Sequence, residues 1–246
     1  MNRSSGAILA SSVAVGAHSL PLILSVGGIR ERVSQHLCGR GDLGGVSLTF
    51  DDGPDRASTP LFIEELDRLK WSATFFLLGS MTRQHPDVAR QLVDAGHEVA
   101  VHGDRHRNHV LRRPHEVRED MLRATDSIAT ITGTSPRWYR PPYGAVSWAT
   151  LATARELSLD VVLWTTWGRD WRRRATPRSI HDDVMGGLDP GGTILLHDSD
   201  CTSSTGSWKA TLAALPLLST SLDRRDLAVR PLGDHLAHLA TASGVR

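Results

Sequence analysis

The sequence predicts an α/β fold in which seven parallel strands form a closed or nearly closed barrel. From residue 45 onward, short apolar runs alternate with helical patterns, and parallel strands need right-handed helical crossovers of this kind. The apolar runs are almost continuous, as in strands that are buried on both faces. A length of 246 residues suits one such barrel. An open doubly wound sheet is the alternative.

The predicted strands cover residues 46–50, 73–77, 98–102, 138–140, 160–164, 193–197 and 227–232. Helical signals lie between them. Thr59-Pro60 and Thr176-Pro177 each combine a capping residue with a proline in the first turn of a helix. An apolar stripe at helical spacing, which Gly133 closes, consists of Val117, Met121, Ala124, Ile128 and Ile131.

The first 44 residues are predicted to be separate from the domain of residues 45–246. Residues 6–29 contain no Asp, Glu, Lys or Arg, and such a stretch is about long enough to cross a bilayer. Val15-Gly16-Ala17 resembles the small-residue cleavage site of a signal sequence. We favour a signal or membrane anchor, and hence a secreted or membrane-anchored protein of the cell envelope. A helix packed on the domain of a cytoplasmic protein is the alternative.

Charge and cysteine content argue against three classes of protein. Lys and Arg number 28 against 27 Asp and Glu, a net charge of +1, so no basic excess exists to neutralise nucleic-acid phosphates. Two cysteines, Cys38 and Cys201, are too few for a disulfide framework or a thiolate zinc cluster. A disulfide between these two requires that they meet in space, which their spacing leaves open.

Two adjacent carboxylates, Asp51 and Asp52, follow the first predicted strand and precede the Gly53-Pro54 breaker. Neighbouring side chains of a strand point to opposite faces, but the backbone rotates at a turn, so the two carboxylates can converge on one site. One of them would bind a metal while the other transfers protons. An ordinary hairpin turn is the alternative, because Asp and Gly are common turn residues.

Two histidines four residues apart, His102 and His106, follow the third predicted strand. If the chain turns helically there, both imidazoles share one face. With one carboxylate from the first strand, they would complete the three protein ligands of a catalytic zinc centre. The H-x-x-x-H spacing is weak by itself, and we expect most of the twelve histidines, His109 among them, to be solvated or hydrogen-bonded.

The segment Arg140-Pro141-Pro142-Tyr143-Gly144 follows the fourth predicted strand. Its prolines stiffen the backbone, so that the Tyr143 amide can donate to a developing oxyanion. Arg140 can hold a carboxylate in its ionised form. A solvent-facing loop is the alternative.

The last two groups follow the fifth and sixth predicted strands. Asp170 beside His197 would favour the imidazolium and fix its tautomer, which makes His197 a candidate general acid. Leu195 and Trp171 would form the walls of a small apolar slot. For the tryptophans, and for Trp164 above all, core packing is the alternative.

The position of these groups decides between the alternatives. Each lies at or just beyond the carboxyl end of a predicted strand, where the active sites of β/α barrels are built. Residues with unrelated structural roles have no reason to share that position. We therefore interpret the following six as one site: Asp51, Asp52, His102, Arg140, Asp170 and His197.

The five ordered motifs resemble those of the polysaccharide deacetylase family, the NodB-homology carbohydrate esterases, over about residues 45–232. The resemblance implies a distorted, TIM-like, seven-stranded β/α barrel. It implies Asp51 as the catalytic base and a divalent metal, expected to be Zn²⁺, on three ligands. These ligands are Asp52, His102 and His106.

The remaining roles also follow from the resemblance. Arg140 would orient the base, and the Tyr143 amide would bind the oxyanion. His197 would act as the acid, with Asp170 as its partner. The residues implied to contact the substrate are Trp171 and Leu195, around the acetyl methyl group, and Tyr143.

The activity implied is hydrolysis of the N-acetyl group of an amino sugar in a chitin-like or peptidoglycan-like polysaccharide, with release of acetate. An O-acetyl esterase of xylan-type glycans and a catalytically silent glycan-binding protein are the alternatives.

Two departures from the family pattern concern the metal site and the substrate contacts. Gly103 stands where a Ser or Thr hydroxyl usually braces the metal loop, so we expect weaker metal binding. Trp167 and Gly168 stand where an acidic residue is frequent, which affects substrate contacts.

Overall fold

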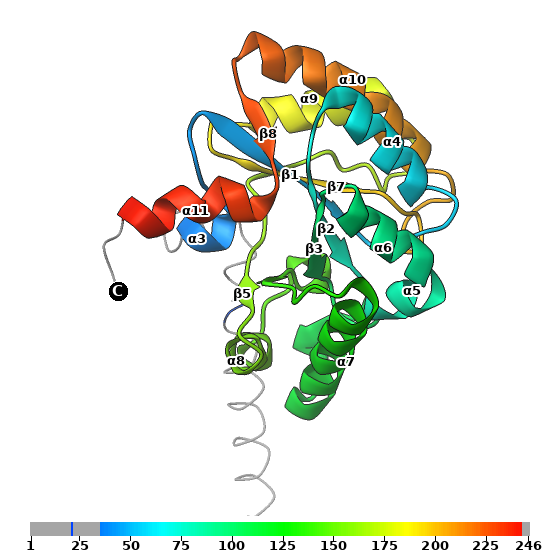
Figure 1. Cartoon of the computed structure of the whole chain (residues 1–246), viewed down its shortest axis with the longest axis vertical. Helices are drawn as coiled ribbons and strands as arrows, with labels where there is room; N and C mark the ends of the chain where they lie inside the picture. The colour runs from blue at the N-terminus through cyan, green and yellow to red at the C-terminus, as the bar shows by residue number, and fades with distance from the viewer. Residues whose placement is uncertain (1–20, 22–34, 243–246) are drawn as a thin grey trace, which may run out of the picture.

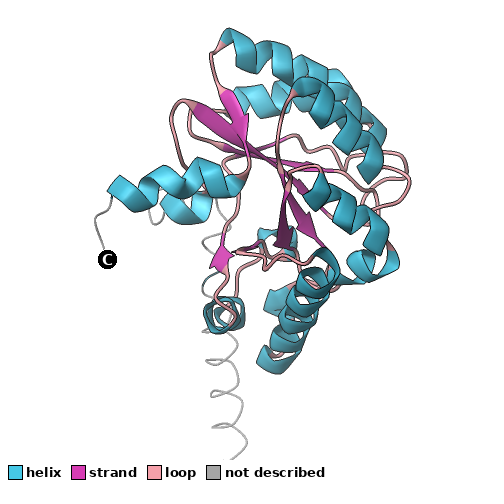
Figure 2. Cartoon of the chain, in the orientation of Figure 1, coloured by secondary structure: helices cyan, strands magenta, loops and turns pink. Residues whose placement is uncertain are grey.

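A computed structural model of the chain describes residue 21 and residues 35–242. One parallel sheet curls into a distorted barrel, and helices surround it (Figures 1 and 2). The predicted α/β barrel is therefore confirmed. The apolar stretch 6–29 lies outside the described residues apart from Pro21. Among the described helices, none combines the length and apolar character needed to span a membrane.

All the predicted strands are present, several of them shorter than expected. They are β1 (Gly45–Asp51), β2 (Thr74–Leu77), β3 (Glu98–Val101), β4 (Trp138–Tyr139), β5 (Asp160–Val161), β7 (Thr193–His197) and β8 (Ala228–Arg230), to which the structure adds β6 (Thr166–Trp167). Neighbouring strands follow the order β5-β4-β3-β2-β1-β7-β6, and β8 pairs with the start of β1. Each of these pairs is parallel.

One stretch of chain, residues 160–167, connects the two edges of the sheet. Its first half pairs with β4, but Thr165 N donates to Thr193 O, and β6 then pairs with β7. A single straight strand can pair with both edges only where these lie about two strand spacings apart, ~10 Å. The chain changes partner instead, so the predicted strand 160–164 is wrong beyond Val161, and the barrel is distorted there.

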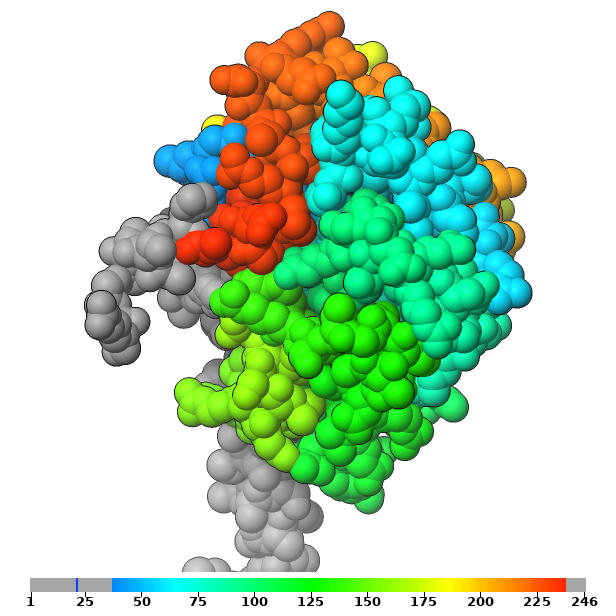
Figure 3. All heavy atoms as spheres, viewed as in Figure 1, coloured from blue at the N-terminus to red at the C-terminus, as the bar shows by residue number. Residues whose placement is uncertain are grey.

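The helices that form the outer layer contact one another in the order α9, α10, α4, α6, α7, α8. Figure 3 shows the segments from α4 to α7 side by side across one face of the molecule. Together with the shorter helices, their bounds are α3 (Gln35–Cys38), α4 (Thr59–Leu69), α5 (Gly79–Gln84), α6 (Pro86–Asp94), α7 (Pro114–Thr132), α8 (Trp148–Glu156), α9 (Pro177–Gly187), α10 (Trp208–Arg224) and α11 (Leu232–Ala242).

Two of the predicted helix starts can be compared with the structure. Thr176 caps α9 as predicted, since its side chain accepts a hydrogen bond from Ser179 N. In α4, Thr59 is already helical, and Ser58 occupies the N-cap position. The Thr59 hydroxyl is used elsewhere, because it donates to the buried carboxylate of Asp198. The α7 stripe is confirmed, with Gly133 ending the helix at a φ of 70°.

Alternate residues of the strands face two apolar layers. In β1, Val46, Leu48 and Phe50 pack in the large cluster beneath the outer helices, whereas Thr49 and Asp51 face the barrel interior, as expected for a period of two. The interior cluster contains Phe76, Ala100, Trp138, Val162, Leu232 and Leu236. The last two residues belong to α11, which therefore closes the amino end of the barrel. The polar groups remain at the carboxyl end.

Candidate active site

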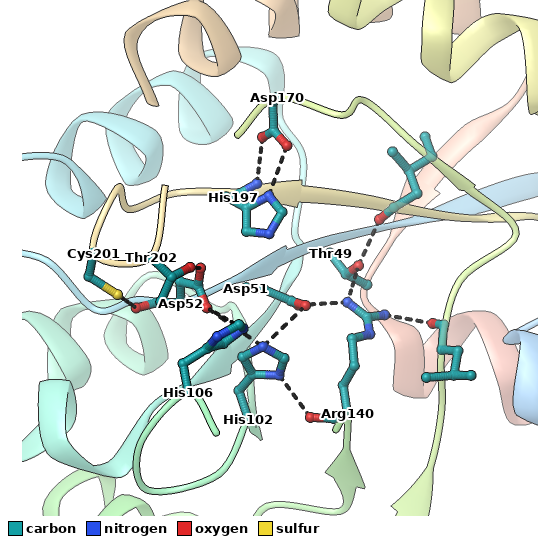
Figure 4. A network of polar contacts seen from close by, with 12 residues as sticks. Thr49, Asp51, Asp52, His102, His106, Arg140, Asp170, His197, Cys201 and Thr202 are labelled. Atoms are coloured by element: carbon teal, nitrogen blue, oxygen red, sulfur yellow. Dashed lines mark hydrogen bonds and ion pairs between the residues drawn. The ribbon is translucent and has the colours of Figure 1, made fainter. Parts of the chain in front are cut away.

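The predicted site residues meet at the carboxyl end of the barrel (Figure 4). His102 lies two positions beyond Ala100, and His197 lies two beyond Leu195, so the strand period directs both imidazoles inward. Asp51 and His197 are register partners on the adjacent strands β1 and β7. Segments that are far apart in the sequence thus contribute to one cluster, which supports the interpretation as a site rather than as separate turns.

Asp52, His102 and His106 form a candidate metal centre. Their ligand atoms all lie within 4.8 Å of one another, and both histidine Nε2 atoms are 3.6 Å from Asp52 Oδ1. Two ligands about 2.1 Å from one tetrahedral ion would lie ~3.4 Å apart. Asp52 Oδ1 is buried with no hydrogen-bond donor on it, as a ligand atom would be. The residues present therefore fit a divalent metal.

The surroundings of His102 select the form that binds metals. Its Nδ1 lies 2.8 Å from the carbonyl oxygen of Arg140, so Nδ1 carries the proton and Nε2 faces Asp52. Burial lowers the pKa of His102 to about 3, although the Asp52 charge opposes that shift. The imidazole is therefore neutral at physiological pH. Burial also lowers the pKa of His106.

The chain does not turn helically between His102 and His106, so the condition for a shared helix face is not met. Residues 102–106 form a bent loop, because Gly103 has a φ of +88°, which a right-handed helix does not contain. The two rings nevertheless meet, with centroids 5.2 Å apart. His109, expected to make ordinary hydrogen bonds, contacts Asp120 and Tyr139.

Asp51 is held in the barrel interior by Arg140. Nη1 of Arg140 donates to Asp51 Oδ1 at 2.7 Å and to Thr49 Oγ1 at 2.8 Å, while Nη2 donates to Leu163 O at 2.8 Å. Burial raises the pKa of Asp51, and the charges of Arg140 and His197 oppose that rise. The other oxygen, Oδ2, lies 3.6 Å from His102 Nε2. Asp51 therefore presents one oxygen to the metal centre, where it can take up a proton.

His197 and Asp170 form a buried ion pair. His197 Nδ1 lies 2.8 Å from Asp170 Oδ1, and the backbone N of His197 donates to Oδ2 at 2.8 Å. Thr211 Oγ1 donates to the same oxygen at 2.9 Å. Burial alone would lower the pKa of His197, but the charge and hydrogen bond of Asp170 outweigh it and raise the pKa to about 10. Nε2 is the ring nitrogen left to donate a proton.

Asp51, His102, His106 and His197 line a cleft of about 330 Å³. Leu195 and Trp171 are part of its wall, as predicted. Trp164 also lines it and stacks on Trp167 at 5.5 Å between ring centroids. Its partly buried side chain packs against the cluster of Val146 and Leu163 as well, so Trp164 joins the cleft wall to the core. Tyr143 has a left-handed φ of 61° and is 64% exposed at the rim. Its ring lies against that of His106, with centroids 4.4 Å apart.

Three hydroxyl residues that sequence reasoning missed support the site: Thr49, Thr202 and Thr211. Thr202 donates to Asp52 Oδ2. Only Thr49 carries a signal in the sequence, because it precedes Asp51 by two positions in a strand and so shares its face. Cys201 lies close to this site, with Sγ 3.4 Å from Asp52 O. No disulfide joins it to Cys38, which is buried in α3.

Comparison with known proteins agrees with this geometry. The sequence model of the family described as polysaccharide deacetylase matches residues 40–162, half of the chain. The chitooligosaccharide deacetylase of Bradyrhizobium sp. (strain ANU 289) is 36% identical over 203 residues, which cover 78% of this chain and 92% of that protein. The chain belongs to the polysaccharide deacetylase family.

Solved structures share the fold of this polysaccharide deacetylase. The Bc1960 peptidoglycan N-acetylglucosamine deacetylase superposes with a TM-score of 0.74 at 27% identity, covering 80% of this chain and 91% of that one. BA3943 of Bacillus anthracis, a CE4 family pseudoenzyme, gives 0.71 at 26% identity, covering 78% and 65%. Because a deacetylase and a pseudoenzyme share the fold, activity has to be argued from the site residues.

The two residues that depart from the polysaccharide deacetylase pattern both lie at the site. Trp167 lies between Trp164 and Trp171, with centroids 5.5 and 4.8 Å away. It extends the aromatic wall of the cleft. Gly103 lies in the loop between the two histidines, where a side chain would be strained by the positive φ.

Proposed function

We propose that this chain is a metal-dependent hydrolase that removes acetyl groups from N-acetylated amino sugars in a polysaccharide and releases acetate. The observation that carries the proposal is the pairing of a candidate base and a candidate acid on adjacent strands, next to three metal-binding side chains. Asp51 and His197 are register partners, and Asp51 Oδ2 lies 3.6 Å from His102 Nε2.

Asp52, His102 and His106 would hold the metal, and we propose Zn²⁺, because two imidazoles and one carboxylate form a common catalytic zinc set. A bound divalent ion acidifies water and polarises the amide carbonyl. Such a set leaves a coordination position for water or substrate. The donor atoms present favour this ion over Mg²⁺ or Ca²⁺, which prefer oxygen ligands.

The chain's own residues would then move the protons. Asp51, which Arg140 keeps oriented, accepts the proton of the attacking water. The backbone amide of Tyr143 donates to the oxygen that becomes negative in the tetrahedral intermediate. His197 donates from Nε2 to the leaving amine, since Nδ1 is engaged by Asp170. Trp171 and Leu195 enclose the acetyl methyl group. Acetate and a free amino sugar are the products.

The test measures zinc content and acetate release from N-acetylated chitooligosaccharides with the purified full chain. Asp51→Asn should retain zinc and lose acetate release, whereas His102→Ala should lose both. His181→Ala is the matched control, because this histidine lies on α9 and bonds Asp182 and Ser221. Full activity of either site variant contradicts the assigned roles.

The same assay separates the alternatives. Glycan binding without zinc or acetate release would indicate a catalytically silent binding protein. Acetate release from acetylated xylan alone would indicate an O-acetyl esterase. We expect the amide substrate to be turned over, because His197 is built to protonate a poor leaving group such as an amine.

A further inference from the structure

The loop between the two metal-binding histidines is fixed through its backbone. On one side, the first amides of α5 donate to it, from Gly79 N to Gly103 O and from Ser80 N to Asp104 O, both at 3.0 Å. Gly79 lets the start of α5 lie this close to both the loop and α7, since a Cβ there would lie 2.8 Å from Asp104 Oδ1 and 2.7 Å from the Cα of Ala124 on α7. These bonds satisfy carbonyl groups of the loop and leave its amides to another partner.

That partner is Asp120 on α7. The amide of Asp104 donates to Asp120 Oδ2 at 2.9 Å, and the amide of Arg105 donates to Oδ1 at 3.3 Å. His109 Nε2 lies 3.4 Å from Oδ2, and its Nδ1 lies 3.1 Å from the Tyr139 hydroxyl. The Asp120 side chain is only 10% exposed. One carboxylate on a long helix therefore ties the loop to α7.

Gly103 and Asp120 fit each other. A Cβ at residue 103 would lie 2.8 Å from Asp120 Oδ2, so a Ser or Thr at 103 could not coexist with the carboxylate in its present place. The residue that lacks the usual hydroxyl is thus the one that admits Asp120. A hydroxyl at residue 103 and the Asp120 carboxylate would each fix the same short segment, which ends at His106.

We propose that Asp120 is a positioning residue for the metal site: its carboxylate fixes the backbone of residues 104 and 105, and with it His106, in place of a hydroxyl at residue 103. The inference rests on the proposed metal centre and goes beyond it. Asp120 is not one of the three candidate ligands and does not line the cleft. Its effect on metal binding is preorganisation, because a loop that is already fixed loses less conformational entropy when the ion binds.

The test compares Asp120→Ala and Asp120→Asn with the unaltered full chain. Chelator competition gives the zinc dissociation constant, and amide hydrogen exchange of the metal-free protein reports on residues 104 and 105. Asp120→Ala should raise the dissociation constant about tenfold or more, in the range known for groups that orient metal ligands, and should accelerate exchange at both amides. Asp120→Asn retains one acceptor oxygen and should lie between. Asp126→Ala, an exposed residue of the same helix, is the control.

A dissociation constant within twofold of the unaltered chain in both variants, with unchanged exchange at 104 and 105, would overturn the proposal. Should Asp120→Ala not fold, Asp120→Asn alone decides by the same two measurements. Neither readout depends on turnover. A chain that binds zinc in this way but releases no acetate would contradict the proposed hydrolase activity and leave the role of Asp120 intact.

Discussion

At the scale of single residues, the acid–base pair is defined by what each group is bonded to. Asp170 accepts hydrogen bonds from the backbone of His197 and from Thr211, so its carboxylate is fixed while it faces the imidazole. This fixed charge raises the pKa of His197 to about 10 against the effect of burial. The imidazolium is therefore the form present at neutral pH, as a general acid requires.

Asp170→Asn should shift the alkaline limb of the activity profile. Removing the carboxylate lowers the pKa of His197, so the proton is lost at lower pH than in the unaltered protein. We expect kcat/KM for acetate release at pH 8 to fall by about 10², with a smaller loss at pH 6. The measurement is the pH profile of kcat/KM. Asp183→Asn, which alters the surface pair with Arg172, is the control, and coincident alkaline limbs would refute the role of Asp170.

Single residues of the site differ in how far the sequence predicts them. Asp51, His102 and His197 were predictable because strand ends and the two-residue period fix both their place and their direction. Thr202 and Asp120 were not, because each reaches the site from a loop or helix whose distance in space no local pattern encodes. The positive φ of Gly103 was likewise not predicted, because a glycine permits this conformation without requiring it.

At the scale of elements, the loop after β3 is fixed by hydrogen bonds although residue 103 carries no hydroxyl. The comparison with the family pattern predicts weaker metal binding for Gly103, and that remains a prediction. In the structure, the loop is bonded to α5 and α7 on two sides. The positive φ of residue 103 favours glycine there, and so does the 2.8 Å that would separate a Cβ from Asp120 Oδ2.

Gly103→Ser should therefore not strengthen metal binding. We expect the free energy of unfolding to fall by about 1–3 kcal/mol, because the new side chain is strained at this φ and collides with the Asp120 carboxylate. Denaturant unfolding measures the change. Gly186→Ser in α9 is the control, since a Cβ there meets nothing within 4 Å. A Gly103→Ser protein that is as stable as the unaltered chain and binds zinc more tightly would show that the lost hydroxyl, not Asp120, is the element that matters.

At the scale of the whole molecule, the side chains that close the barrel and the side chains of the candidate site lie toward opposite ends of its axis. The amino end is filled by apolar side chains that α11 completes, and the carboxyl end holds the ionisable groups. The sequence predicted the strands but not this closure: the expected strand 227–232 ends at Arg230. Pro231 has no amide proton with which to extend the ladder, and Leu232 already begins α11.

Leu232→Ala tests this separation. The side chain is fully buried in the interior cluster, so its truncation should lower the free energy of unfolding by about 2–5 kcal/mol. Leu217→Ala on α10, where the side chain is 40% exposed, should change it by less than about 0.5 kcal/mol. Acetate release by the folded fraction should be the same in both variants at low temperature, because Leu232 lies at the amino end of the barrel, where its amide donates to Thr74 at the start of β2, and the cleft lies at the other end. A loss of kcat in fully folded Leu232→Ala would mean that α11 also supports the geometry of Arg140 and Asp51, through Phe76, whose ring lies 3.9 Å from the Arg140 guanidinium.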